Sequence, residues 1–584
     1  MTAAHSEHLD APNSMKEWTR NWILLLIVSW SVSLAMLGKN LVDPDLWGHV
    51  LYGQEVLEAG QLPEYSTWNF TTPRYPWINH EHTAELLIAT ADSAGGAAGL
   101  LLLKFTVTVA LLGMLTWHFA SRGLHPATIG IVLLVMSSAI EFHWHFRPPI
   151  FGYFLFAGML ILLDRCFAGW AGENWILPGI DPAEKPREPA YSPFRMRLLY
   201  LVVPLMAVWV NTHESFAEGV VIGGMYLGLR AIESVVIWKS WGRFRRFVLV
   251  GIGMMAAIFI NPYHYRLPLW VAEDIYLPHP EVTDWMSLNL LSEAAIPFWI
   301  IVVMSVAAWR QTRRIDLTHT VILLLLAGQA MSHRRYLAIL GLAWTVWMDA
   351  PIDLLIRTFW AKIARHLSTE APVDLKPANL VTVGLLACMA YFAAIAIPRW
   401  TNISVDVDAY PVAAMQYLAD EELSGRTVVT FNWSQYALAC FDATHAPSKG
   451  AMDGRNRSCY PQEIIDIYRD FVLGDTRPRF RSPNSPPIDP SRALVYENPE
   501  LVLIGRDDWI PSQTLQQHSD KWVILYQDSL AQIWGRKDLF DNPASPRYVS
   551  INRRHVSEDL QQGSISWPAL PKTNKAPVQI VSAQ

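Results

Sequence analysis

The sequence predicts a mainly α-helical polytopic membrane protein with a separate α/β domain at its C-terminal end. Three observations lead to this class. Of the 584 residues, 52% are hydrophobic and only 17% are charged, whereas soluble proteins carry roughly a quarter charged residues. Apolar stretches recur between residues 22 and 398. Beyond about Thr401, short apolar runs alternate with amphipathic helical patterns, which is typical of a small α/β domain.

Composition also excludes several other classes. The formal charge of −6 and the pI of about 6.3 give no basic excess, so nucleic-acid binding is not expected. Four cysteines are too few for a disulfide scaffold. The sequence contains no Gly-rich phosphate loop, nucleophile elbow or CxxC motif. An ATP-driven mechanism in the cytosol therefore has no support.

The membrane part is predicted to span residues 22–398. Residues 1–21 are polar, and we expect them to form a cytoplasmic N-terminal tail. The first apolar run, 22–37, has no small-residue cleavage site after it, which favours an uncleaved helix over a signal peptide. Further apolar stretches centre near residues 108, 132, 156, 204, 225, 255, 302, 324, 345 and 388. About eleven transmembrane helices are therefore predicted.

Basic residues decide the orientation, because cytoplasmic connections are enriched in lysine and arginine. Every second connection is basic: Arg122; Arg165, Lys185, Arg187, Arg195 and Arg197; Lys239, Arg243, Arg245 and Arg246; Arg310, Arg313 and Arg314; Arg357, Lys362 and Arg365. The remaining connections hold only scattered basic residues: Lys39, Arg74, Arg147, Arg266, Arg334, Arg335 and Arg399. We therefore expect a cytoplasmic N-terminus and an extracytoplasmic C-terminal domain.

The C-terminal domain is predicted over residues 399–542. Its strands are "RTVVTF", "LVLIG", "WVILYQ" and "AQIWGR", and its helices include "PVAAMQYLADEEL" and "YPQEIIDIYRDFVLG". The Pro-rich stretch 477–491 reads as a loop, and residues 543–584 are predicted to be a poorly ordered tail. Outside the cytoplasm, Cys440 and Cys459 could form a disulfide.

Polar residues collect on the predicted outer face. Nine histidines lie there before the C-terminal domain: His49, His80, His82, His143, His145, His213, His264, His279 and His333. The first outer loop, 39–83, also holds Asp43, Asp45, Asn79 and Glu81, with Glu85 just beyond it. Such a set favours a water-filled cavity bounded by helix ends. The alternative is that these are ordinary residues of interfacial loops.

The segment Asp43-Pro44-Asp45 directly follows the first predicted helix. Residues two apart in an extended segment point the same way, so the two carboxylates could hold Mg²⁺ or Mn²⁺. Alternatively, their repulsion would raise one pKa and make that group a general base. A simple turn that ends the helix is the third interpretation.

Arg334 and Arg335 adjoin His333 on the side of the membrane that should be poor in positive charge. Paired guanidinium groups suit a phosphate or diphosphate, although lipid-headgroup anchoring explains them equally well. Arg147 and Arg266 are similar candidates.

Two histidine pairs invite a metal interpretation. His80 and His82 are two residues apart, so they do not match the His-Glu-x-x-His motif of zinc proteases. A nitrogen-rich metal site built from these two residues together with His143 and His145 is a minor alternative.

These segments resemble a group of uncharacterised bacterial membrane proteins related to the GT-C glycosyltransferases. The resemblance starts in the first outer loop, "DPDLWGHVLYGQEVLEAGQLPEYSTWNFTTPRYPWINHEHTAELLIA". It continues through "FRPPIFGYFLF", "WVNTHESFAEG", "NPYHYRL", "DWMSLNL" and "SHRRYLAIL". In the outer domain it includes "YPVAAMQYL", "NWSQYAL" and "MDGRNRSCYPQEIIDIYRDF", so it covers about residues 20–537.

The resemblance implies a GT-C fold in the bacterial inner membrane and a polyprenyl-phosphate-linked sugar donor. Asp43 or Asp45 would be the general base or a ligand of Mg²⁺ or Mn²⁺. His80 and Glu81 would line the acceptor side, and Arg334 or Arg335 would bind the donor phosphate. The full set of substrate-binding candidates is His49, Asn79, His80, Glu81, Arg147, His213, Arg334 and Arg335.

The sequence departs from the group's pattern at three positions. Gly48 and His82 stand where tryptophan is usual, and Glu214 stands where glycine is usual. These changes alter the bulk around the first outer loop and bear on the choice of acceptor.

Two rival functions fit the same predicted fold. The first is a non-catalytic scaffold or lipid-binding subunit, in which the outer domain would mediate assembly with a protein partner. The second is a transporter, which would need charged residues at mid-membrane depth and broken helices in two related halves. The sequence shows neither feature of a transporter.

Overall fold

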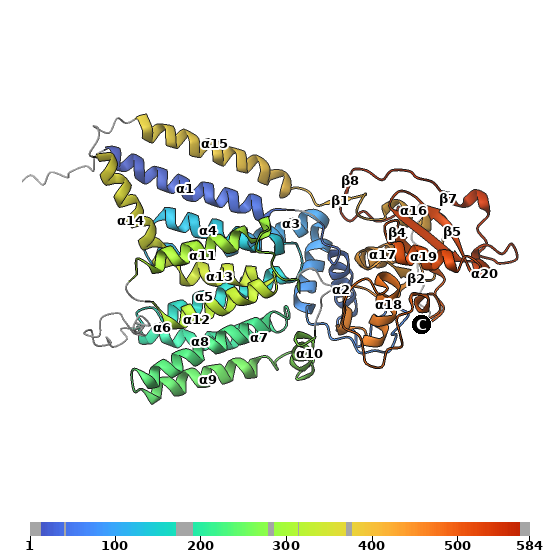
Figure 1. Ribbon diagram of the computed structural model, residues 1–584, viewed down its shortest axis with the longest axis horizontal. Helices are drawn as coiled ribbons and strands as arrows, with labels where there is room; N and C mark the ends of the chain where they lie inside the picture. Colours follow the sequence, from blue (N-terminus) through green and yellow to red (C-terminus); the bar gives the residue numbers. More distant parts are fainter. Residues whose placement is uncertain are drawn as a thin grey trace, which may run out of the picture.

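The computed structural model describes residues 13–39, 42–170, 191–277, 285–312, 315–368 and 376–572. Residues 1–12 of the predicted tail 1–21, residues 171–190 of a basic connection, and residues 573–584 lie outside this description, and the rest of that tail belongs to the first helix, which begins at Asn13. Figure 1 shows a bundle of helices beside a smaller α/β domain, with α2 (Leu46–Ala59) and α10 (Arg266–Ile275) between the two.

Six helices of the described chain are long and apolar enough to cross a membrane. They are α1 (Asn13–Leu37), α3 (His82–Ser121), α4 (Pro126–Ile140, extended by η1), α5 (Pro149–Cys166), α8 (Phe216–Val236) and α15 (Lys376–Arg399). A seventh span results if α13 (Tyr336–Trp347) and α14 (Asp349–Ser368), which are bent by 66° at their junction, count as one. The shorter helices are α6 (Pro193–Arg197), α7 (Val202–Trp209), α9 (Trp241–Ala257), α11 (Ile296–Trp309) and α12 (Leu317–Ser332).

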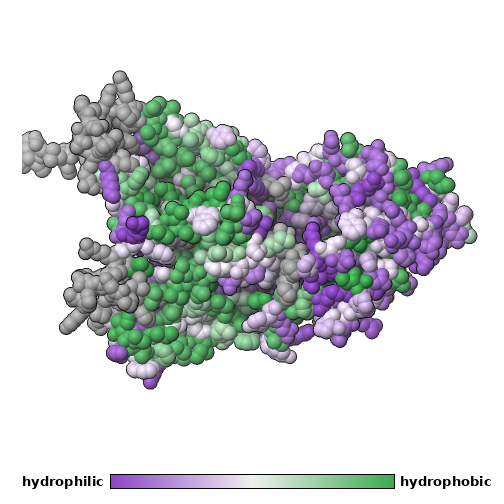
Figure 2. All heavy atoms as spheres, in the orientation of Figure 1, coloured by the Kyte–Doolittle hydropathy of each residue, from purple (hydrophilic) through white to green (hydrophobic). Residues whose placement is uncertain are grey.

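The predicted number of about eleven spans is therefore not confirmed, although each predicted centre lies on a helix. The difference arises from helix length and charge. For example, α12 has only 16 residues, and the first two turns of α9 carry Arg243, Arg245 and Arg246. Figure 2 shows an almost continuous apolar surface over the helical bundle and a polar surface over the C-terminal domain. Leu102, Val303 and Leu380 belong to that apolar surface, with exposed fractions of 65%, 63% and 74%. The chain is an integral membrane protein.

The α/β domain is built on a six-stranded sheet in the order β3-β2-β4-β6-β5-β7. β2 is parallel to β3 and β4, β6 is antiparallel to β4 and β5, and β7 is parallel to β5. The strands are β2 (Arg426–Val429), β3 (Lys449–Gly450), β4 (Leu501–Gly505), β5 (Trp522–Gln527), β6 (Ala531–Arg536) and β7 (His555–Val556). The four strands predicted from sequence are confirmed as β2, β4, β5 and β6.

Five α-helices accompany the sheet: α16 (Val412–Asp420), α17 (Ser434–Ala443), α18 (Gln462–Leu473), α19 (Trp509–Gln517) and α20 (Lys537–Phe540). The two predicted helices are confirmed as α16 and α18. Short 3-10 helices occur at η1 (Glu141–His143), η3 (Leu198–Leu201), η5 (Glu293–Ala295), η6 (Phe431–Trp433), η7 (Asn456–Ser458), η8 (Pro490–Leu494) and η9 (Ile551–Arg553). Much of the predicted Pro-rich loop is irregular, and buried Asp470 holds it through Arg479 at 2.6 Å and Arg492 at 2.5 Å.

Residues 543–572 are ordered, contrary to the predicted tail. β8 (Ser564–Ser566) pairs antiparallel with β1 (Ser404–Asp406), so the domain extends to residue 572. Trp567 is buried and its ring lies 5.0 Å from that of Trp47 in α2. Partners distant in sequence, among them Trp47 and β1, therefore hold a segment that its polar composition alone marks as a tail.

The cysteines also differ from the sequence expectation. All four lie in the described part of the chain, and all four are free. Cys440 is buried in α17, whereas Cys459 lies beside Asn69, whose Nδ2 is 3.8 Å from its sulfur. No Cys440–Cys459 disulfide is formed.

Candidate functional site

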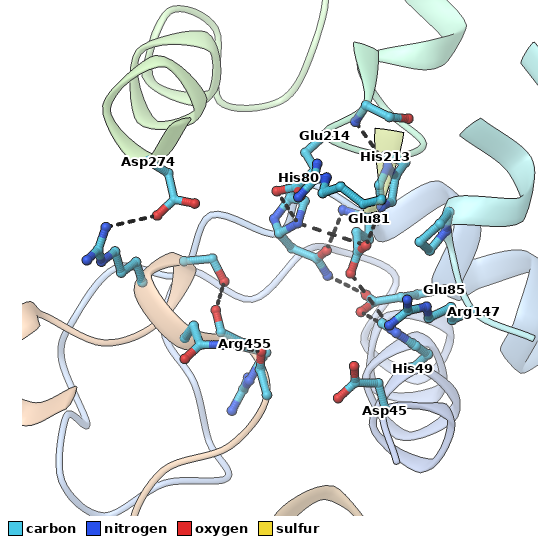
Figure 3. Close-up of a pocket in the computed structure, with 18 of the residues that line it drawn as sticks. Asp45, His49, His80, Glu81, Glu85, Arg147, His213, Glu214, Asp274 and Arg455 are labelled. Atoms are coloured by element: carbon cyan, nitrogen blue, oxygen red, sulfur yellow. Dashed lines mark hydrogen bonds and ion pairs between the residues drawn. The ribbon is translucent and has the colours of Figure 1, made fainter. Parts of the chain in front are cut away.

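A cavity of about 280 Å³ lies where the helical bundle meets the C-terminal domain. Its walls come from α2, the loop before α3, the start of α5, the turn between α7 and α8, α10, the start of α13 and the segment 454–458. Figure 3 shows the side chains of these segments converging from both parts of the protein.

Eight of the ten predicted site residues line this cavity. They are Asp45, His49, Asn79, His80, Glu81, Arg147, His213 and Arg335. The other two do not line it, although Asp43 Oδ2 lies 3.7 Å from Nη1 of Arg147. Asp43 accepts a hydrogen bond from the backbone N–H of Asp45 at 3.0 Å and borders a much smaller pocket. The guanidinium of Arg334 lies 3.7 Å above the ring of Phe142.

Helix α2 brings Asp45 and His49 to the same wall. Asp45 is the residue before the first turn, and His49 follows four residues later, which places both on one helical face. The helix ends at Gly60, whose φ of 67° is a left-handed conformation that glycine adopts without strain.

Glu81 lies at the centre of a histidine cluster. Its Oε1 is 3.3 Å from His213 Nε2 and 3.9 Å from His80 Nε2, and its Oε2 is 3.9 Å from His49 Nδ1. Glu85 continues the cluster, because it accepts a hydrogen bond from Asn79 Nδ2 at 2.6 Å and lies 3.3 Å from His49 Nδ1. Figure 3 shows these contacts as one connected set.

The cluster shifts the pKa values of His49 and His213 in opposite directions. Burial alone would lower the pKa of His49, but the hydrogen bond to Glu85 and the charges of Glu81 and Glu85 raise that pKa to about 9. Burial, with His80 and Arg335 nearby, lowers the pKa of His213 well below its usual value. At neutral pH, His49 is therefore a cation and His213 is neutral.

The carboxyl group of Asp45 is also strongly perturbed. Burial is the main cause, and the negative charge of Asp43 adds to it, so the pKa of Asp45 rises to about 6. His49 and Arg147 act in the opposite direction. Asp45 is thus ionised at neutral pH and is basic enough to take up a proton.

Three side chains have the geometry of a divalent-cation site. His49, Glu81 and Glu85 each offer one ligand atom, and these atoms all lie within 4.8 Å of one another. One imidazole nitrogen and two carboxylate oxygens suit Mn²⁺ or Zn²⁺, whereas Mg²⁺ prefers oxygen ligands alone. The sequence suggested Asp43 and Asp45 as the ligands of Mg²⁺ or Mn²⁺. The group found among the described residues contains neither of them.

Arg335, directly before α13, brings positive charge to the cavity. Arg335 Nη2 lies 3.3 Å from Glu218 Oε1, and its guanidinium stacks 4.6 Å from the ring centre of Trp285. Its side chain keeps an exposed fraction of 22%. Arg335 is therefore held in place by an acid and an aromatic ring, yet remains open to an anion.

Sequence reasoning missed the contribution of the C-terminal domain. Arg455 binds Asp453 through two hydrogen bonds, at 2.9 and 2.7 Å, and its guanidinium lies 4.3 Å from the ring of Tyr52 and 4.5 Å from that of Trp77. The segment "MDGRNRS", in which two arginines flank an asparagine, was the available signal.

Four further residues of the cavity were not among the site predictions. Arg457 Nη1 lies 3.3 Å from Asp274 Oδ1 and so connects η7 to α10. Glu214 and Glu218 border the cavity near Arg335. Glu214 and Glu218 closely follow the predicted site residue His213 in the sequence, and this proximity could have identified them.

Comparison with known proteins establishes the fold. No family model matches the chain, and no curated protein matches its sequence. Among solved structures it is similar to the apo oligosaccharyltransferase of Archaeoglobus fulgidus, with a TM-score of 0.50, 10% identity, and coverage of 83% of this chain and 69% of that one. The same enzyme, AglB, in complex with an inhibitory peptide and a dolichol-phosphate gives a TM-score of 0.51 at 10% identity, with coverage of 85% and 70%.

The apo form of ArnT from Cupriavidus metallidurans is similar along nearly its whole length. The TM-score is 0.50 at 14% identity, with coverage of 89% of this chain and 98% of that one. The protein therefore has a GT-C-like fold, and the resemblance seen in the sequence is confirmed at the level of the fold. At these low identities the similarity shows the fold alone, because proteins that share a fold can catalyse different reactions.

Proposed function

We propose that this protein is a membrane glycosyltransferase of GT-C type that uses a polyprenyl-phosphate-linked sugar donor. One observation carries the proposal: a single cavity at the helix ends holds an ionised acid of raised pKa, Asp45, together with the guanidinium of Arg335. A base and an anion-binding cation are the two groups that transfer from a lipid phosphate requires. The dolichol-phosphate bound to AglB supports this class of donor.

In the proposed reaction, Asp45 takes the proton from an acceptor hydroxyl. The acceptor oxygen then attacks the anomeric carbon, and the bond from that carbon to the phosphate oxygen breaks. The phosphate leaves on the lipid, and Arg335, aided by Arg147, stabilises its negative charge. His80 and Trp270, whose rings lie 4.8 Å apart, border the space left for the acceptor.

The metal is part of the proposal. His49 would give up its proton, and His49, Glu81 and Glu85 would then hold a divalent ion, for which Mn²⁺ or Zn²⁺ fits the ligands better than Mg²⁺. When bound, such an ion would supply positive charge to the cavity.

We further propose that the cavity faces the outside of a bacterial inner membrane. The helix ends opposite the C-terminal domain carry Arg122, Arg165, Arg243 and Arg357, and such basic ends usually lie in the cytoplasm. The N-terminus would then be cytoplasmic and the C-terminal domain extracytoplasmic. The rival scaffold function predicts a cavity filled by side chains, and the open charged cavity favours the enzyme over it.

The direct test is binding and turnover of an undecaprenyl-phosphate-linked sugar by the purified protein in lipid nanodiscs. We expect Arg335→Ala to weaken donor binding by about tenfold to a hundredfold, because it removes a charged hydrogen-bond donor. Arg334→Ala is the matched control, since Arg334 lies outside the cavity, and it should bind as the wild type does. Asp45→Asn should bind the donor but lose turnover by roughly 10²-fold or more. Equal binding of the donor and of undecaprenol by the wild type would overturn the proposal.

A further inference from the structure

The N-terminal end of α2 packs directly on α17 of the C-terminal domain. Gln435 of α17 is buried, with an exposed fraction of 4%, and its amide faces Asp45. With its nitrogen toward Asp45, the amide donates to the Asp45 backbone carbonyl at 2.8 Å and to Asp45 Oδ1 at 3.2 Å. The opposite orientation would bring oxygen against oxygen, so the hydrogen bonds determine the orientation of the amide.

Two glycines make room for this contact. A Cβ on Gly48 would lie 2.5 Å from Cδ of Gln435, and a Cβ on Gly454 would lie 2.5 Å from Asp45 Oδ1 and 2.6 Å from the end of the Gln435 amide. Such distances are far shorter than a van der Waals contact allows, so any side chain at either position would displace Gln435 or Asp45. Gly48 is also a position at which this sequence departs from the pattern of the group that it resembles.

The carboxylate of Asp45 has little other support. Asp45 occupies the capping position of α2, but in the described part of the chain its side chain makes no capping hydrogen bond. Its helix therefore holds the backbone of Asp45 and leaves the orientation of the carboxylate to its surroundings. The amide of Gln435 is the group that reaches both the backbone and the carboxylate.

We propose that Gln435 is a positioning residue for Asp45, and that the C-terminal domain thereby completes the catalytic centre of the membrane part. Gly48 and Gly454 allow the close approach that this role needs. The inference rests on the proposed function, because positioning matters only if Asp45 acts on a substrate. A base that is free to turn away from the acceptor hydroxyl loses much of its effect, since proton transfer depends on a well-oriented contact.

The main test separates binding from turnover of the undecaprenyl-phosphate-linked sugar. Gln435→Met keeps the length of the side chain and removes the amide. We expect donor affinity within twofold of wild type and turnover lower by about tenfold or more. Gln416→Met is the matched control, because Gln416 lies in α16 and bonds to Asp420 and Lys572 on the surface of the same domain. Wild-type turnover by Gln435→Met would overturn the inference, as would an equal loss in both variants.

Gly48→Ala gives the same test by a different route. It leaves Gln435 intact but occupies the space that its amide needs, so turnover should fall while donor affinity is retained. Unchanged turnover in this variant would count against the role assigned to the contact.

A second measurement keeps the inference separate from the proposed function. In a double-mutant cycle on the melting temperature, Asp45→Ala and Gln435→Met should give shifts that are not additive, because each removes the partner of the other. Additive shifts would show that the two side chains do not interact and would overturn the inference. If the cycle shows coupling but the wild type neither binds nor turns over the donor, the proposed function fails and takes the catalytic role of Gln435 with it.

Discussion

His49 Nδ1 lies 3.3 Å from Glu85 Oε1, and this contact joins α2 to the first turn of α3. It connects the helix that carries Asp45 to a membrane-spanning helix, so the two walls of the cavity are tied by a pair of buried side chains. The pair raises the pKa of His49 from 6.5 to about 9, so its contribution to stability depends on pH.

The His49–Glu85 pair predicts a stability that depends on pH. A raised folded-state pKa contributes stability that is fully present below pH 6.5 and is lost as the pH rises through about 9. The melting temperature of the metal-free wild-type protein should therefore fall across this interval, by an amount corresponding to about 3 kcal/mol. In Glu85→Gln the fall should be much smaller. Glu558→Gln, at an exposed surface pair, serves as control and should follow the wild type.

Asp45→Asn is expected to stabilise the protein while it removes turnover. Burial raises the pKa of Asp45 from 3.8 to about 6, so the stability of the protonated form is present below pH 3.8 and is lost as the pH rises through 6. Replacing the carboxylate by a neutral amide should recover about 3 kcal/mol at pH 7.5. Melting curves of both proteins should differ at pH 7.5 and converge near pH 4. A less stable Asp45→Asn protein at neutral pH would contradict the assigned pKa.

Turnover of the donor should rise with pH through about 6, because the base must be ionised. The charge of Arg147 holds the pKa of Asp45 down, so Arg147→Gln should move this limb of the profile to higher pH. The measurement is a pH–rate profile of sugar release from the undecaprenyl-phosphate donor. If turnover of the wild type and of Arg147→Gln fell at the same acidic pH, the group that limits turnover there would not be Asp45.

Metal binding is testable without any substrate. Wild-type protein stripped with a chelator should take up one Mn²⁺, detected by electron paramagnetic resonance, and Glu81→Gln should lose most of this affinity because it removes a charged ligand. His145→Ala is the control, since His145 lies outside the group His49, Glu81 and Glu85. Equal Mn²⁺ uptake by Glu81→Gln and wild type would exclude this site.

Much of the architecture follows from the sequence. Hydropathy locates the helices, because burial in lipid leaves a long apolar signal, and alternation locates β2, β4, β5 and β6. The number of spans does not follow, since a run of apolar residues shows neither where a helix bends nor how far it reaches. For example, the apolar run around residue 345 predicts a helix but gives no sign of the 66° bend between α13 and α14.

The sequence predicts which residues gather at the site but not which way their side chains point. Residues on one membrane face were expected to converge, and eight of ten candidates line one cavity. Sequence alone cannot choose between Arg334 and Arg335, because one step along a helix turns a side chain by about 100°. Arg455 and Gln435 were out of reach for another reason: they arrive from a domain nearly 400 residues farther along the chain.

The contact between Trp47 and Trp567 also sets an order for biosynthesis. Trp47 belongs to the first loop, but its ring packs on Trp567 and its Nε1 donates to the carbonyl of Pro568 at 2.9 Å. Trp47 and Pro568 are separated by 521 positions along the chain, so a ribosome produces the second long after the first. The first membrane helices can be inserted long before that moment, yet α2 cannot reach its final packing until residues 567 and 568 have been made. A nascent or truncated chain would thus be integrated in the bilayer while one wall of the cavity still lacks its final packing.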